Sequence, residues 1–88
     1  MISIIIPVLN EEVNIKKLVT YLQNCSLNKE IEIIVADGGS TDGTRAAAEA
    51  SGATLIVSAV KGRATQMNAG ARAAKYNILY FVHILPMP

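Results

Sequence analysis

The residues best suited to bind a ligand lie between Ile31 and Thr44, which read IEIIVADGGSTDGT. An apolar run there leads into Asp37, then glycines, then residues that often start helices. A carboxylate at the carboxyl end of a buried parallel strand lies where open α/β sheets bind their ligands, and glycine lets a ligand approach the backbone. We therefore predict that Asp37 and Gly38 contact a ligand. The alternative is that Asp37 and Asp42 only form turn and helix-capping hydrogen bonds.

A second candidate segment, from Pro7 to Glu12, reads PVLNEE. It lacks the G-x-G-x-x-G turn that brings a dinucleotide onto a helix, and its two carboxylates would repel the pyrophosphate. A dinucleotide-dependent oxidoreductase is therefore disfavoured. Asn10 and Glu11 could instead accept hydrogen bonds from a base or ribose, and Leu9 offers an apolar surface to the base. The alternative is that these polar residues only start a helix.

A third candidate segment covers residues 61–70 and reads KGRATQMNAG. A guanidinium at the start of a helix, beside free backbone donors, suits a phosphate oxygen or a base carbonyl, so Arg63 is the candidate for that contact. Lys61 is interpreted as a solvated loop charge. Gln66 and Asn68 are either exposed helix residues or a wall of the site.

Apolar segments alternate with segments of helical periodicity along the whole chain. We predict strands at Ile2–Val8, Ile31–Ala36, Ala53–Val57 and Ile78–Val82, and helices at about 11–24, 42–50 and 62–74. This alternation requires parallel strands joined by right-handed crossovers. The expected fold class is α/β: a Rossmann-like three-layer α/β/α arrangement with a four-stranded parallel sheet. If the first strand lies beside the fourth, the loops after strands one, two and four open onto one crevice.

Length and composition restrict the function further. The 88 residues suit a single domain, and 51% hydrophobic against 17% charged residues suits an ordered core. Eight basic and seven acidic residues give no bulk attraction for nucleic acid. Cys25, the only cysteine, excludes an internal disulfide. No apolar run reaches the roughly 18 residues of a membrane helix, so we predict a cytoplasmic protein without a transmembrane segment.

Three blocks together resemble the amino-terminal, nucleotide-binding half of family-2 glycosyltransferases with the GT-A fold. The blocks are IIIPVLNEE, IIVADGGSTDGT and KGRATQMNAGA, in that order. The resemblance covers nearly all of the chain and implies a partial GT-A nucleotide-diphospho-sugar transferase fold that binds a nucleotide-diphosphate sugar. It implies that Asp37 lies toward the base and ribose, that Pro7 to Glu11 line the base pocket, and that Arg63 lies near the base or the diphosphate.

The end of the chain departs from the family pattern. In the family, the fourth strand leads into an acidic motif whose carboxylate binds a divalent cation on the donor diphosphate. This chain instead reads FVHILPMP from Phe81 to its end, and no acidic residue follows Glu49. His83 is a poor substitute ligand for Mg²⁺ or Mn²⁺, which prefer oxygen.

From this departure we predict that residues 1–88 form a single truncated nucleotide-sugar-binding domain. We expect no catalytic or metal-binding residue in it and no cofactor of its own, with Mg²⁺ or Mn²⁺ needed only in a complete family member. Inverting hexosyl transfer would need a catalytic base from an acceptor-binding half, so this chain alone should be inactive. The sugar, the base and the acceptor are not identified.

Two further hypotheses concern partners. The chain could instead be a small α/β interaction module with no ligand, in which Asp37 and Arg63 are dispensable. Separately, an unpaired apolar sheet edge at Ile78–Val82 would recruit other strands, which predicts a homo-oligomer through that edge.

Overall fold

The structure, a computed structural model, describes residues 2–25, 31–58 and 62–82. Its elements alternate strand and helix, as the sequence predicts. In chain order they are β1 (Ile2–Val8), α1 (Glu12–Cys25), β2 (Ile31–Asp37), α2 (Thr44–Ala50), β3 (Thr54–Val57), α3 (Arg63–Ala73) and β4 (Ile78–Phe81). None of the described helices is long and apolar enough to cross a membrane.

The four described strands form one sheet in the order β3-β2-β1-β4, with parallel pairing throughout. The first strand lies beside the fourth, with Ile2 opposite Ile78 and Ile5 opposite Phe81. The sequence alone left this strand order open, and the structure meets the condition that the first strand lies beside the fourth. It also places β4 at one edge of the sheet in the part of the chain that the structure describes.

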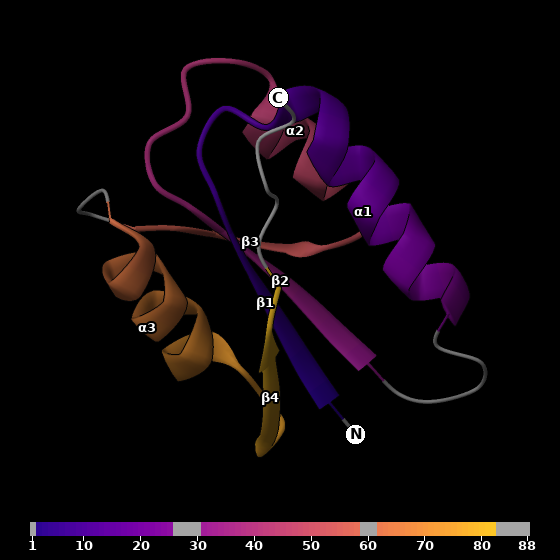
Figure 1. Ribbon diagram of the computed structural model, residues 1–88, viewed down its shortest axis with the longest axis vertical. Helices are drawn as coiled ribbons and strands as arrows, with labels where there is room; N and C mark the ends of the chain where they lie inside the picture. Colours follow the sequence, from indigo (N-terminus) through magenta and orange to yellow (C-terminus); the bar gives the residue numbers. More distant parts are fainter. Residues whose placement is uncertain (1, 26–30, 59–61, 83–88) are drawn as a thin grey trace.

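Helices cover both faces of the sheet, with α1 and α2 on one face and α3 on the other (Figure 1). The core under α1 and α2 consists of Ile4, Ile6, Val8, Ile15, Val19, Ile33, Val35 and Ala48. Ile5 and Ile34, which alternate with these positions along their strands, are also fully buried. Burial on both faces explains why β1 is apolar almost without interruption.

Helix α3 approaches β1 closely because position 70 is a glycine. A Cβ atom at Gly70 would lie 2.5 Å from the Cγ2 atom of Ile5. The absent side chain therefore sets the height of α3 above the sheet.

Pro7 lies just beyond Ile5 and Phe81, the last β1–β4 pair among the described residues. The Val8 carbonyl accepts the N–H of Gly38 in the extension of β2, whereas the Ile5 carbonyl accepts the N–H of Val82 after β4. The backbone groups of successive residues in a parallel strand point to opposite neighbours, so Pro7, like Ile5, faces the β4 side, where it has no N–H to donate. In the part of the chain that the structure describes, β1 and β2 stay paired as far as Val8 and Asp37, beyond the last β1–β4 pair.

Candidate functional site

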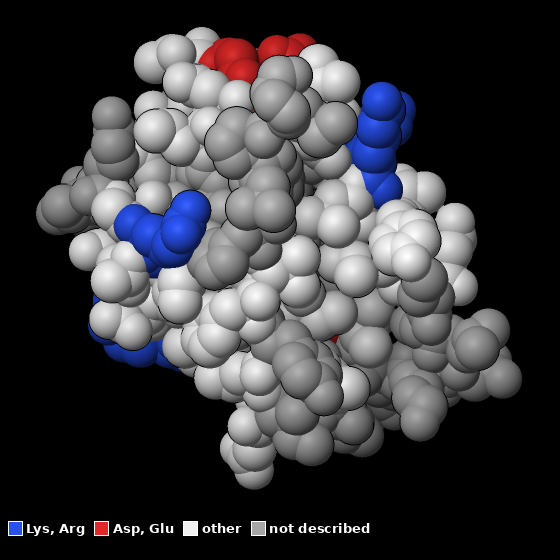
Figure 2. All heavy atoms as spheres, viewed as in Figure 1, with Lys and Arg blue, Asp and Glu red and all other residues white. Residues whose placement is uncertain are grey.

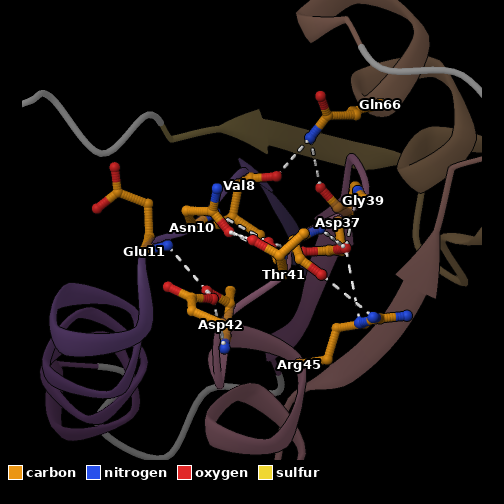
Figure 3. Close-up of polar contacts among 12 residues, drawn as sticks. Val8, Asn10, Glu11, Asp37, Gly39, Thr41, Asp42, Arg45 and Gln66 are labelled. Atoms are coloured by element: carbon orange, nitrogen blue, oxygen red, sulfur yellow. Dashed lines mark hydrogen bonds and ion pairs between the residues drawn. The ribbon is translucent and has the colours of Figure 1, made fainter.

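Three segments meet at the carboxyl ends of β1 and β2: the loop after β1, the loop after β2 and the first turn of α3 (Figure 3). Gln66 joins the helix to both strands, because its Nε2 atom donates to the carbonyls of Val8 and Ala36, each at 2.8 Å. Arg63, the first residue of α3, is thereby brought to the same edge of the sheet. The structure thus brings the three predicted segments together.

Asp37 is fully buried at the end of β2. Its Oδ2 atom accepts the backbone N–H groups of Gly39 and Ser40, each at 2.9 Å, and its Oδ1 atom accepts the Ser40 hydroxyl. These bonds close the turn that follows β2, as Asp side chains often do. The structure places Asp37 in the alternative, turn-forming role, and a contact of its carboxylate with a ligand stays a prediction.

Arg45 stabilises the same turn and was missed by the sequence reasoning. Its Nε atom lies 3.9 Å from Asp37 Oδ2, and its Nη2 atom donates to the Ser40 carbonyl at 3.1 Å. The side chain is 49% exposed, so the ion pair is partly screened by solvent. The available signal was a cation in the first turn of the helix that follows a buried carboxylate.

The two glycines after Asp37 have different roles. Gly38 is buried, and a Cβ atom there would lie 2.5 Å from Gln66 Oε1, so the position makes room for a protein side chain. The prediction that Gly38 contacts a ligand stays a prediction. Gly39 is exposed, has a φ of 107° and has nothing within 4 Å of its Cβ position. Gly39 is therefore the glycine that opens onto free space.

Asn10 joins the two loops. Its φ of 53° lies in the left-handed region, which Asn tolerates better than most residues. Its Oδ1 atom accepts the Thr41 N–H at 2.8 Å, and its own N–H donates to Ser40 Oγ at 2.9 Å. Asn10 is exposed and Leu9 half-buried. Both remain accessible at the edge where the segments meet.

Glu11 starts α1. Its carbonyl accepts the N–H groups of Asn14 and Ile15, and its own N–H donates to Thr44 Oγ1 at 2.8 Å. The carboxylate accepts the Asn14 side-chain amide at 3.1 Å and points away from the Asn10–Asp37 cluster (Figure 3). This position fits the alternative of a helix start, and the bond from Glu11 to a base or ribose stays a prediction.

Glu12 and Asp42 cap each other's helices. Asp42 Oδ2 accepts the Glu12 N–H at 3.4 Å, and Glu12 Oε1 accepts the Gly43 N–H at 2.9 Å. Asp42 Oδ1 also accepts the N–H of Thr44 at 2.9 Å and its hydroxyl. Carboxylates are favourable at helix N-termini. Figure 2 shows acidic side chains gathered at the upper edge of this face, apart from the basic ones.

These bonds make Asp42 a pH-dependent contributor to stability. The Thr44 hydroxyl, followed by backbone N–H groups, lowers the pKa of Asp42 below 3.8. A lowered folded-state pKa stabilises the fold above the unfolded pKa and stops doing so as the pH falls through the folded value. Asp42→Asn should therefore melt below the wild type near neutral pH, and the two melting temperatures should converge as the pH falls below 3.8.

Thermal melts of the wild type and of Asp42→Asn, recorded from neutral pH to below pH 3.8, measure this difference in melting temperature. Glu49→Gln, which removes an exposed carboxylate of the same helix, should not reproduce the convergence. A constant gap between wild type and Asp42→Asn at every pH would contradict the assignment.

Arg63 is exposed at the start of α3, and Pro7 is half-buried at the end of β1. Lys61, His83 and the segment that departs from the family pattern lie outside the described residues. Among the described residues, no group of three or more His, Cys, Asp or Glu side chains could hold a metal ion. The carboxylates near the site accept protein hydrogen bonds instead. These residues therefore do not fit the divalent cation of a complete family member.

Comparison with known sequences identifies the family. Residues 3–83 match the sequence model described as Glycosyl transferase family 2. The chain belongs to glycosyltransferase family 2. No curated protein matches this family-2 chain.

Solved structures of glucosyl-3-phosphoglycerate synthase from Mycobacterium tuberculosis are similar to this family-2 chain. The complex with Mn²⁺, UDP and glucosyl-3-phosphoglycerate is 28% identical with a TM-score of 0.83, covering 94% of this chain and 33% of the synthase. The complex with Mn²⁺, UDP-glucose and phosphoglyceric acid is 27% identical with a TM-score of 0.82, covering 94% and 32%. The chain thus spans about a third of these enzymes. The likeness supports the predicted α/β fold of the GT-A type.

Proposed function

We propose that this family-2 chain binds a nucleotide-diphosphate sugar at the carboxyl ends of β1 and β2. The observation that carries the proposal is the convergence of the three family segments at one edge, where Gln66 and Asn10 join them. The similar synthase structures contain UDP or UDP-glucose. A uridine nucleotide is therefore the first ligand to test.

The accessible residues at this edge suit the parts of such a ligand. Leu9, beyond Pro7, offers half-buried apolar surface to a base, and exposed Asn10 offers amide groups. Gly39 leaves open space beside the backbone. The exposed guanidinium of Arg63 can donate two parallel hydrogen bonds to a phosphate, the geometry that makes arginine a common phosphate-binding residue.

Sugar transfer by this chain alone is not part of the proposal. Cleavage of the sugar–phosphate bond builds charge on the leaving diphosphate, which a metal ion or a cationic clamp must stabilise. The described residues provide no metal site, and the similar enzymes are about three times as long. We propose that the chain contributes donor binding, and that inverting hexosyl transfer needs an acceptor-binding part with a base.

Calorimetry with UDP tests the proposal. We expect saturable binding that Arg63→Ala weakens by about tenfold, which is about 1.4 kcal/mol for the loss of a solvent-exposed arginine–phosphate contact. Arg72→Ala is the matched control, because Arg72 is exposed in the last turn of the same helix. No binding at millimolar UDP would contradict the proposal.

Two further comparisons separate the alternatives. Binding should not require Mn²⁺, and a strict Mn²⁺ requirement would contradict the expectation that this chain holds no metal of its own. The alternative of an interaction module without a ligand expects no effect of Arg63→Ala. Self-association through the β4 edge, where Phe81 is 41% exposed, and a cytoplasmic location stay predictions.

A further inference from the structure

Gln66 is a buried polar residue on a helix face that packs against the sheet. Only 4% of its surface is exposed. Its amide nitrogen donates both of its hydrogens, to the carbonyls of Val8 and Ala36 at 2.8 Å each. Because a buried amide is costly unless its groups are paired, these bonds hold the side chain in one place.

The amide oxygen of Gln66 holds the start of its own helix. It accepts the N–H of Gly62 at 3.3 Å. Gly62 has a φ of 147° and offers no side chain to cap α3. One side chain therefore connects the ends of β1 and β2 with the residue that precedes α3.

The surroundings of Gln66 are built to admit it. A Cβ atom at Gly38 would lie 2.5 Å from Gln66 Oε1, so a glycine is needed there for the amide to reach both carbonyls. Gly70, one turn later on α3, allows the close approach to Ile5. Gly38, in the loop after β2, and Gly70, on α3, together set how closely the Gln66 side chain approaches the sheet.

We infer that Gln66 is the residue that positions Arg63 for the diphosphate of the nucleotide. Arg63 and Gln66 are three positions apart on α3, so they lie on neighbouring points of one helix face. Gln66 is fixed on the carbonyls of Val8 and Ala36, and Arg63, the first residue of α3, lies one turn nearer the amino end of the helix. The inference rests on the proposed function, and gives Gln66 no contact with the ligand itself.

A double-mutant cycle with two ligands tests the inference. The affinities of UDP and of uridine are measured by calorimetry for wild type, Gln66→Met, Arg63→Ala and the double variant. Methionine keeps the length of the side chain and removes both the donor and the acceptor. We expect each single variant to weaken UDP by about tenfold and the double variant to be no weaker than Arg63→Ala. Uridine, which has no diphosphate, should bind equally well to all four proteins.

Gln23→Met is the matched control. Gln23 also donates its amide to a backbone carbonyl, that of Ser51 at 2.9 Å, but it lies on α1 away from the site. The variant should bind UDP like the wild type. If Gln66→Met does not fold, Gly38→Ala displaces the same amide without removing it and should show the same selective loss of UDP affinity.

Two results would overturn the inference. One is an additive loss of about a hundredfold for UDP in the double variant, since independent residues add. The other is an equal weakening of uridine and UDP by Gln66→Met, which would indicate general damage to the site. Failure of the wild type to bind UDP is a different outcome, because it contradicts the proposed function itself.

Discussion

Asp37→Ala will lower the free energy of unfolding by about 3 kcal/mol, because it removes a buried carboxylate that closes the turn after β2. The backbone N–H groups of Gly39 and Ser40 and the Ser40 hydroxyl would lose their acceptor. For a domain of this size the loss corresponds to a melting temperature lower by roughly 15 °C. Urea denaturation of the variant and the wild type measures it.

Thr41→Ala is the control for this prediction. Thr41 is exposed in the same loop, and the variant keeps the N–H that Asn10 accepts, so its stability should change by less than about 0.5 kcal/mol. Asp37→Ala with wild-type stability and weakened UDP binding would show that the carboxylate contacts the ligand. That result would reverse the role that the structure gives Asp37.

Gly70→Ala is the second substitution with a large expected effect. Replacing glycine by alanine inside a helix ordinarily stabilises it by about 1 kcal/mol. Here the new Cβ atom would meet Ile5 Cγ2 at 2.5 Å, and Ile5 is fully buried with little freedom to move. We expect a net destabilisation of about 2 kcal/mol from overpacking, measured by urea denaturation.

The Ile5→Ala background shows whether the clash is the cause. Ile5→Ala alone should cost about 2–5 kcal/mol, because it leaves a cavity. In that background Gly70→Ala should no longer destabilise, since the atoms it meets have been removed. A stabilising effect of Gly70→Ala in the wild-type background would contradict the close approach of α3 to β1.

The sequence predicts the layers and the parallel pairing of the strands well for physical reasons. A strand buried on both faces must be apolar at consecutive positions, which β1 is, and alternation with helices allows only a parallel sheet. Two of the three candidate segments follow parallel strands and the third starts a helix. Because the carboxyl ends of parallel strands lie at the same edge of a sheet, their meeting there was also predictable. These inferences depend on residue type and order alone.

The roles of individual side chains were less predictable. A carboxylate after a strand serves a ligand or a turn equally well, and Asp37 serves the turn because Gly39 and Ser40 supply donors to it. From the sequence, Gln66 could be either an exposed helix residue or a residue that lines the site. Its burial depends on a missing side chain at Gly38, on another element, which periodicity along α3 cannot show.

The mutual capping of Glu12 and Asp42 bears on any attempt to redesign this edge. Each loop supplies an acceptor for an amide of the other, and Asn10 adds a further bond between them. Grafting one foreign loop would leave the remaining loop with unpaired groups. A design that replaces one of these loops to alter ligand preference therefore has to replace the loop after β1 and the loop after β2 together, from the same donor protein.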